Sequence, residues 1–184
     1  MGDFYDFIDH WIGDFCAGSK MPIDFRKQGT MLFAKLYNTC TQEEKWFKIC
    51  NSNEIIYRVQ TLDEGFEKVI DFNNLYYSFS NDLDGLANVI KYDKNLRTKG
   101  ILIIESKPNE AINLNELLND MYEDYSSRYT CENEIISRLD RKSAKSIYYL
   151  KGLTDCLNYK KNGVEIDLND TNLSYTEFVQ KYHL

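Results

Sequence analysis

The sequence has 184 residues, of which 43% are hydrophobic and 28% charged, and these values are typical of a soluble globular chain with one core. The formal net charge of -7 argues against non-specific binding to nucleic acid, which depends on Lys and Arg neutralising phosphates. No segment has the ~20 apolar residues that cross a bilayer, and the N-terminus lacks a signal-peptide pattern. We therefore expect a cytoplasmic protein, or one delivered into a host cytoplasm, without a membrane partner.

The residues that commonly bind metals or phosphates are sparse in this chain. Its five cysteines are scattered without a CxxC pair, which indicates reduced thiols. The two histidines, at positions 10 and 183, do not suffice for a zinc site or a histidine-based triad. No GxG occurs, so neither a dinucleotide fingerprint nor a Walker loop is present. We expect no metal, and any nucleotide would be held largely by side chains.

The first fifty residues predict helices, and the chain then turns to strands. Helices are expected over 4–15, after Asp24, and from a capping box formed by Thr41 and Glu44. A strand follows at 55–59, and a second capping box, Thr61 with Glu64, predicts a short helix. A strand at 76–79 then leads into a helix capped by Asn81.

The second half of the chain continues the same alternation. A buried strand is expected at 101–104, a helix capped by Asn113 follows, and the acidic triplet Glu132-Asn133-Glu134 opens another strand. Two more strands are expected at 147–150 and 164–168, the last entered through a hairpin-like turn at Asn162-Gly163. The sequence predicts one α+β domain over 1–184, with helices in 1–50 and a mostly antiparallel sheet system after them.

Glu132 and Glu134 stand together at the mouth of an apolar run. Alternate residues of a strand point to one face, so both carboxylates would project side by side, where like charges destabilise a sheet. Paired acids suit chemistry at a sugar bond, where one carboxylate steadies an oxocarbenium and the other orients the attacker. Taken alone, the pair is better explained as two solvated acids at the rim of a sheet, and the features upstream are what favour the catalytic interpretation.

Two further polar features interrupt apolar strands. Arg58 lies within the apolar run 55–59, where its charge must be paired, reach solvent or meet an anionic ligand. Ser78 and Ser80 flank Phe79, so alternation places both hydroxyls on one face. Considered alone, Arg58 is best explained as an edge-strand arginine that faces solvent, and the two serines as a helix cap and its neighbour. If the serines lie beside Glu132 and Glu134, one hydroxyl can hold a carboxylate in a productive rotamer.

In their order along the chain, the three features resemble the mono-ADP-ribosyltransferases of the Arg-Ser-Glu class. That family has an aromatic-Arg strand, an aromatic-Ser-x-Ser strand and a later Glu/Gln-x-Glu strand. The matching stretches here are Tyr57-Arg58, Tyr77-Ser78-Phe79-Ser80 and Glu132-Asn133-Glu134. The resemblance covers residues 54–140 and implies an ADP-ribosyltransferase-like fold, with N-terminal helices packed on a mostly antiparallel core of two sheets. Two positions depart from the pattern, because Phe79 stands where the family usually has Thr and Val59 where it often has Gly.

The resemblance implies an enzyme that cleaves the nicotinamide–ribose bond of NAD and transfers ADP-ribose to an acceptor. Glu134 would hydrogen-bond the nicotinamide ribose and stabilise the oxocarbenium, Ser78 would orient Glu134, and Ser80 would support that network. Arg58 would clamp an NAD phosphate. The backbone of Val59 would contact nicotinamide, and Arg97 would add a second phosphate contact if it is not a solvated loop charge.

The resemblance also implies where the acceptor binds. Glu132 would orient or deprotonate it, and Glu at this place resembles the arginine-modifying members, so the expected acceptor is an arginine of a target protein. Tyr129, in the loop before the acidic strand, would stack on that group. Such an enzyme would act as an intracellular toxin or a phage or bacterial effector, with an antitoxin or immunity protein as a further partner.

Two alternatives remain open at this stage. The acceptor can be a nucleic acid, an option that the acidic balance disfavours unless the fold builds a structured basic pocket. The chain can also be a non-catalytic acidic binding or immunity protein with a basic partner, which its charge and its two departures from the family pattern favour.

Overall fold

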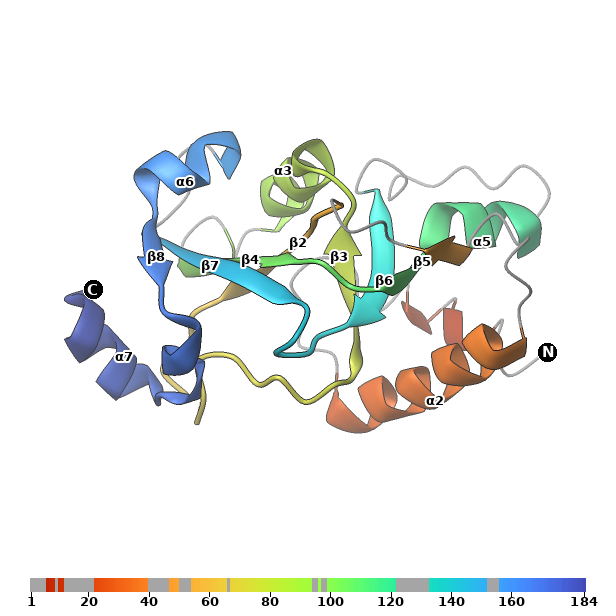
Figure 1. Ribbon diagram of the computed structural model, residues 1–184, viewed down its shortest axis with the longest axis horizontal. Coiled ribbons are helices and arrows are strands. Elements are labelled where there is room, and N and C mark those ends of the chain that lie inside the picture. Colours follow the sequence, from red (N-terminus) through yellow and green to blue (C-terminus); the bar gives the residue numbers. More distant parts are fainter. Residues whose placement is uncertain are drawn as a thin grey trace.

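The computed structural model describes residues 6–8, 10–11, 22–39, 47–49, 54–65, 67–93, 96, 99–121, 133–151 and 156–184. Eight strands form one sheet in the order β1-β5-β6-β3-β2-β4-β7-β8, and each neighbouring pair is antiparallel. An N-terminal helix and further helices between the strands complete an α+β fold (Figure 1).

The strands are β1 (Phe47–Ile49), β2 (Ile56–Thr61), β3 (Tyr76–Ser80), β4 (Gly100–Ser106), β5 (Glu110–Asn113), β6 (Glu134–Arg138), β7 (Ala144–Lys151) and β8 (Val164–Ile166). The α-helices are α2 (Ile23–Thr39), α3 (Leu83–Tyr92), α5 (Leu114–Met121), α6 (Tyr159–Asn162) and α7 (Tyr175–Tyr182). Two 3-10 helices, η2 (Cys156–Asn158) and η3 (Leu168–Asn172), precede α6 and α7. Residues 6–8 and 10–11 are also helical, in agreement with the helix expected over 4–15.

The expected division of the core into two sheets is wrong. Tyr57 of β2 pairs with Ser80 of β3 and makes the hydrogen-bonded ladder continuous. This junction is nevertheless the narrowest in the sheet, because it consists of a single residue pair, whereas β2 pairs with β4 along its whole length from Ile56 to Thr61. Beyond that pair no further ladder pair joins β2 to β3, and we call this unpaired stretch between the two strands the seam.

The core lies on both faces of the sheet because successive strand residues point to opposite sides. Along β4, Leu102 belongs to one hydrophobic cluster and its neighbours Ile101 and Ile103 to another. The first face is covered by segment 62–75 and α7. On the opposite face, α3 and α6 cover the β4–β7 half, and α2, α5 and the N-terminal helical residues cover the β3–β6 half (Figure 1).

Most of the predicted elements are confirmed. The helix after Asp24 is α2, and the strands expected at 55–59, 76–79, 101–104 and 147–150 are β2, β3, β4 and β7. Asn113 caps α5, since its Oδ1 accepts a hydrogen bond from the backbone N of Glu116 at 3.2 Å. The cap of α3 is one residue later than expected, because Asp82 rather than Asn81 accepts from the backbone N of Gly85, at 2.7 Å.

Three local predictions are wrong. Phe47–Ile49 is strand β1 rather than helix, because its backbone pairs with β5; Thr41 and Glu44 lie outside the described residues. The described residues after Thr61, 62–65 and 67–70, are not helical, and the Thr61 hydroxyl donates to Asp63 instead of capping a helix. Gly163 ends α6 and does not form a hairpin turn, so β7 and β8 are joined through η2 and α6.

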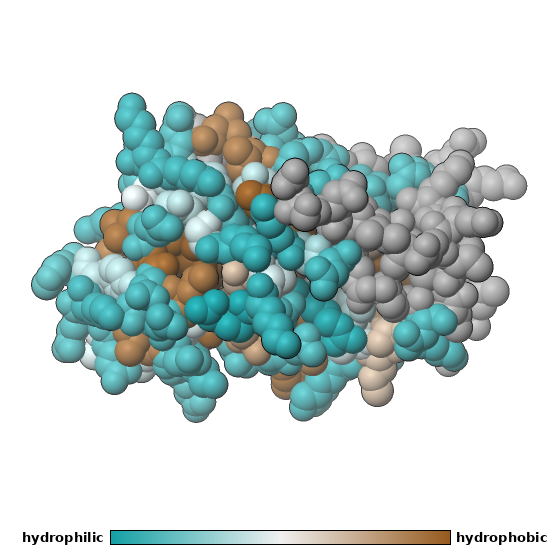
Figure 2. Space-filling view, viewed as in Figure 1, coloured by the Kyte–Doolittle hydropathy of each residue, from teal (hydrophilic) through white to brown (hydrophobic). Residues whose placement is uncertain are grey.

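The face in Figure 2 is mainly hydrophilic, as the charged composition predicts. The large hydrophobic side chains that remain exposed within the described ranges are Ile23, Met31, Leu157 and Val164. Among the helices described, none has the length and apolar character needed to cross a membrane.

Candidate functional site

Ser78 and Glu134 meet at the edge of the sheet where β6 begins. Glu134 is the first residue of β6 and is paired in register with Ser80, two residues beyond Ser78 on β3. Side chains two apart share a face, so the Ser78 hydroxyl and the Glu134 carboxyl lie on the same face, and Ser78 lowers the pKa of that carboxyl. Two strands that lie far apart in the sequence thus bring the predicted serine and acid to one face of the sheet.

The indole of Trp11 supplies a second hydrogen bond to the same carboxylate. Its Nε1–H donates to Oε1 of Glu134 at 3.1 Å. Trp11 is only 3% exposed and belongs to the cluster that covers the β3–β6 half of the sheet. The N-terminal helical residues therefore form part of the site as well as part of the core.

Burial sets the protonation behaviour of Glu134. It raises the pKa of this carboxyl above its usual range, while the hydrogen bonds from Ser78 and Trp11, and the charge of Arg58, act in the opposite direction. The effect of burial is the larger one, so Glu134 stays protonated to a higher pH than a glutamate in solvent does. A carboxylate held this way is fixed in position and responds strongly to any positive charge that approaches it.

Arg58 lies at the seam between β2 and β3. Its Nη1 donates to the backbone oxygen of Ser78 at 2.9 Å, so the guanidinium spans the seam where no ladder bond forms. Its Nε is buried and has no hydrogen-bond partner. Burial, and then the neighbouring charge of Arg26, lower the pKa of Arg58 to about 10, which still leaves it charged at neutral pH.

A second guanidinium lies beside the first. The guanidinium carbons of Arg26 and Arg58 lie 4.0 and 4.7 Å from the centre of the Tyr77 ring. Each positive charge is stabilised by the ring, but the two repel one another. An anion bound between them would relieve this repulsion, so the pair is a candidate anion clamp.

Five directly opposed residues form a polar row across the sheet. In register order they are Ser146, Glu105, Tyr57, Ser80 and Glu134, from β7, β4, β2, β3 and β6. Glu105 is 3% exposed and accepts hydrogen bonds from the hydroxyls of Ser146 and Tyr159, and Nζ of Lys160 lies 2.7 Å from it. Burial opposes its charge, but these three partners hold its pKa below the usual range. The Glu105 end of the row is thus already satisfied, and we assign it a structural role.

Asn133 controls how the acidic strand begins. Its φ is 48°, in the left-handed region, and its side-chain Nδ2 donates to Asp82 at 2.8 Å. Its backbone oxygen also accepts from the N of Asn81 at 2.9 Å. The expectation that Glu132 and Glu134 alternate along one extended strand is therefore wrong, because β6 starts only at Glu134 and the residue before it is not extended.

The other predicted site residues fall in different places. Ser80 is 3% exposed and lies in register between Tyr57 and Glu134. Val59 packs into the hydrophobic cluster beneath α3 and α6, so its backbone alone remains available to a ligand. Glu132, Tyr129 and Arg97 lie outside the described residues.

Sequence reasoning missed Trp11, Arg26 and Asn133. Trp11 lies within the helix expected over 4–15, and the apolar spacing that predicts this helix gives no sign of a use for the indole N–H group. Arg26 follows the expected helix start and resembles an ordinary solvated charge. Asn is the non-glycine residue most tolerant of left-handed backbone, which is a signal, though a weak one, for a break before Glu134.

Within the parts of the chain that the structure describes, no three His, Cys, Asp or Glu side chains are grouped so that they could hold a metal ion. The arrangement is instead a partly buried carboxylate that accepts a hydrogen bond from Trp11 and lies within the influence of the Arg58 guanidinium. Neither a known family model, nor any curated protein, nor any solved structure matches this chain significantly.

Proposed function

We propose that the chain is a mono-ADP-ribosyltransferase that cleaves NAD at the nicotinamide–ribose bond and transfers ADP-ribose to an acceptor. The observation that carries the proposal is that Ser78 and Glu134 share one face of the sheet and that the charge of Arg58, which bonds the backbone of Ser78, acts on the same carboxyl. The motif order in the sequence led us to expect these three side chains together. Trp11 and Arg26 add a second donor and a second guanidinium at the same place.

Glu134 carries the chemistry in this proposal. As the bond between ribose C1′ and the nicotinamide nitrogen breaks, its electron pair leaves with nicotinamide and positive charge develops on the ribose. The ionised Glu134, hydrogen-bonded to the ribose and fixed by Ser78 and Trp11, stabilises that charge. A buried carboxylate does this more effectively than a solvated one, because water does not screen it.

Arg58 and Arg26 bind the pyrophosphate of NAD in this proposal. The buried Nε of Arg58 has no hydrogen-bond partner, so this guanidinium retains a donor for a phosphate oxygen. The mutual repulsion of the two arginines is removed when a dianionic group lies against them. Arg26 supplies a second guanidinium, and Arg97, which lies outside the described residues, remains a further expected phosphate contact. Ser80 and the Val59 backbone line the adjacent strands.

The acceptor completes the reaction. Its nucleophile attacks ribose C1′ and loses a proton, which Glu132 accepts in this proposal, while Tyr129 stacks on the acceptor group. The expected acceptor is an arginine of a target protein, since a carboxylate attracts and orients a guanidinium. Glu132→Gln should then reduce ADP-ribosyl transfer more than NAD hydrolysis, and equal loss of both activities would contradict an acceptor-directed role.

The proposal is tested by measuring nicotinamide release from NAD by the purified chain and by two variants. Glu134→Gln should lower the rate ~10²-fold or more, because the developing charge loses its counter-charge. Glu165→Gln makes the same change at an exposed residue of β8 and should leave the rate unchanged. Substantial release by the folded Glu134→Gln variant would overturn the mechanism.

NAD binding gives a second readout that does not depend on turnover. NAD at 100 times its Kd should raise the free energy of unfolding by ~2.7 kcal/mol, which thermal unfolding detects. A folded wild-type chain that neither releases nicotinamide nor is stabilised by saturating NAD would contradict the proposal. That outcome would favour the alternative of an acidic, non-catalytic binding or immunity protein.

A further inference from the structure

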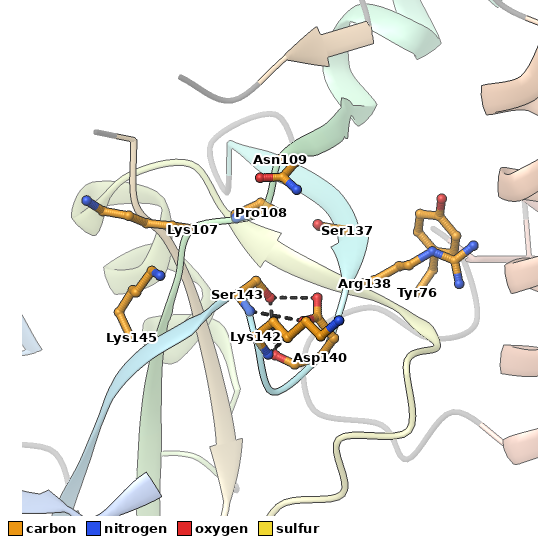
Figure 3. Close-up of a pocket in the computed structure, with 10 residues that line it drawn as sticks. All are labelled: Tyr76, Lys107, Pro108, Asn109, Ser137, Arg138, Asp140, Lys142, Ser143 and Lys145. Atoms are coloured by element: carbon orange, nitrogen blue, oxygen red, sulfur yellow. Dashed lines mark hydrogen bonds between the residues drawn. The ribbon is translucent and has the colours of Figure 1, made fainter. Parts of the chain in front are cut away.

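A polar pocket of about 340 Å³ lies where two connections of the sheet meet (Figure 3). The β4–β5 connection lines it with residues 107–109, and the β6–β7 connection with Asp140, Lys142 and Ser143. The proposed transferase site does not use this pocket. Its strand residue Arg138 ends β6, whereas Glu134 begins that strand, so ~13 Å of extended chain separates the two positions.

The pocket is basic although the chain as a whole carries a charge of -7. Four cationic side chains line it: Lys107, Arg138, Lys142 and Lys145. The one carboxylate in the lining, Asp140, accepts hydrogen bonds from the backbone N of Lys142 at 2.9 Å and of Ser143 at 3.0 Å, and from the Ser143 hydroxyl at 2.8 Å. These bonds turn the carboxylate back onto its own loop, as Figure 3 shows, so it stabilises the turn.

Arg138 is held in position before any ligand arrives. Its guanidinium lies 4.6 Å from the centre of the Tyr76 ring, and its Nη1 donates to the backbone oxygen of Asn74 at 3.0 Å. A guanidinium has five N–H donors, so several remain for a ligand after this contact. An arginine fixed in this way loses little conformational entropy when it binds an anion.

The lysines add charge on the opposite side of the pocket. Lys142 and Lys145 are exposed, and neither forms an ion pair with a carboxylate in the described part of the chain. In Figure 3, Lys145 lies on the same side of the turn as Lys107, and Arg138 lies on the other side, beside Tyr76. Arg138, Lys142 and Lys145 thus bring cations from β6, the β6–β7 turn and β7 to one hollow, in which Asp140 is the one acid among the described lining residues. This arrangement lowers the free energy of a multiply charged anion there.

We infer that this pocket binds a phosphate-bearing ligand, with Arg138, Lys142 and Lys145 as the residues that recognise it. The volume is at the lower end of the range ~300–1,000 Å³ that small-ligand pockets occupy. Among the lining residues that the structure describes, Tyr76 is the one aromatic side chain; it is 4% exposed and lies against Arg138, so these residues offer no free ring face to stack a base. Recognition therefore rests on phosphate, supplied by a small phosphate ester or by a nucleic-acid backbone, and does not depend on NAD cleavage.

Binding is tested by titrating the full chain at low salt with pyrophosphate, with AMP and with a single-stranded oligonucleotide of about 10 nucleotides. The variant Lys142→Glu/Lys145→Glu reverses two exposed charges in the pocket. The control Lys68→Glu/Lys151→Glu reverses two exposed charges outside its lining and makes the same change in net charge. Thermal unfolding of all three proteins checks that they are folded.

The same titrations are carried out on an Arg58→Gln background, which removes the proposed NAD clamp. There we expect pyrophosphate to bind the pocket-intact chain and the control alike, and the pocket variant ~10-fold or more weakly. If the oligonucleotide binds with a lower Kd than both small ligands, and if the logarithm of its binding constant falls with the logarithm of salt concentration with a slope steeper than one, nucleic acid is the source of the phosphate. Equal or tighter binding of AMP or pyrophosphate identifies a small phosphate ester. Absence of pyrophosphate binding to the pocket-intact chain, or equal weakening in the control, would overturn the inference.

Discussion

The indole nitrogen of Trp11 donates a hydrogen bond of 3.1 Å to Oε1 of Glu134, a residue 123 positions later in the chain. The contact ties the N-terminal helical residues to the first residue of β6. Around it, the Trp11 ring meets that of Phe33 edge-on, with centroids 5.4 Å apart, inside a buried aromatic cluster. The packing of this cluster therefore fixes the position of the carboxylate on which the proposed chemistry depends.

Trp11→Phe tests this dependence. The hydrogen bond from Trp11 lowers the pKa of Glu134, so its loss should raise that pKa further and shift the acidic limb of the rate–pH profile to higher pH. We also expect ~10-fold slower nicotinamide release, because a hydrogen bond to a charged group contributes ~1.5–3 kcal/mol.

Phe33→Leu is the matched control for Trp11→Phe. It loosens the same cluster at a buried position without removing a polar contact to Glu134. If both variants slowed the reaction with an unshifted pH profile, Trp11 would matter only for packing.

Glu134→Gln should separate stability from activity. Burial is the main cause that raises the pKa of Glu134, so the folded state binds its proton more tightly than the unfolded state does. The folded state is therefore penalised increasingly as pH rises through and above the unfolded pKa, at ~4.3. Gln keeps the shape without the charge. We expect the variant to be at least as stable as wild type at pH 7, with a difference that vanishes in acid.

Urea unfolding of Glu134→Gln and wild type at several pH values checks this expectation. The opposite result, a variant that is less stable at neutral pH and equal in acid, would mean that attraction between Glu134 and Arg58 exceeds the cost of burial. The site would then resemble a structural ion pair.

The strand motifs were predictable from the sequence because their information is local. Arg58 and Ser78 each interrupt a short apolar or aromatic run, and such runs predict strands whatever surrounds them. Strand β1 was not predictable, because three residues are too few to show the alternation of apolar and polar residues that marks a strand. They form a strand only because they pair with β5. The partner of Trp11 was equally inaccessible, because a sequence gives the donor of a long-range hydrogen bond but not its acceptor.

The local misreadings also have physical causes. Thr61 and Glu64 have the spacing of a capping box, but the Thr61 hydroxyl binds Asp63, and the backbone N of Val69 donates to Leu173 of the C-terminal segment at 3.0 Å. Tertiary hydrogen bonds thus replace the helical ones. The single Tyr57–Ser80 pair explains why one sheet was expected to be two, since nothing in either strand's sequence reveals how many residues will pair.

Asn133 provides a test of backbone conformation at the start of the acidic strand. At φ 48°, a residue with a Cβ pays ~1–2 kcal/mol that glycine does not, so Asn133→Ala should be less stable than Asn133→Gly. Both variants lose the 2.8 Å hydrogen bond to Asp82, so the comparison isolates the backbone. Urea unfolding measures the difference, and an Ala variant that is more stable than the Gly variant would show that the left-handed conformation is not retained.

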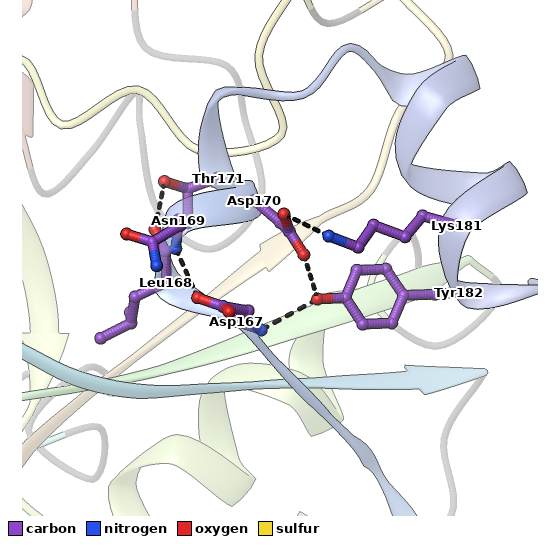
Figure 4. Close-up of polar contacts among 7 residues, drawn as sticks. All are labelled: Asp167, Leu168, Asn169, Asp170, Thr171, Lys181 and Tyr182. Atoms are coloured by element: carbon purple, nitrogen blue, oxygen red, sulfur yellow. Dashed lines mark hydrogen bonds and ion pairs between the residues drawn. The ribbon is translucent and has the colours of Figure 1, made fainter.

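Asp170 anchors the C-terminal helix and should behave in the opposite way to Glu134 (Figure 4). Its Oδ1 lies 2.7 Å from Nζ of Lys181, and its Oδ2 accepts from the Tyr182 hydroxyl at 2.6 Å. That hydroxyl in turn accepts from the backbone N of Asp167 at 2.9 Å. The hydrogen bond from Lys181, and then that from Tyr182, lower the pKa of Asp170.

Because the folded-state pKa of Asp170 is depressed, its contribution is present above the unfolded pKa, ~3.9, and is lost as pH falls through the folded value. Asp170→Asn should therefore cost ~1–3 kcal/mol at pH 7 and progressively less in acid, measured by urea unfolding. Tyr182→Phe removes one of the two bonds but not the charge, so its smaller loss should depend less on pH. A loss for Asp170→Asn that stays constant down to strong acid would assign the effect to packing of α7 and not to the carboxylate.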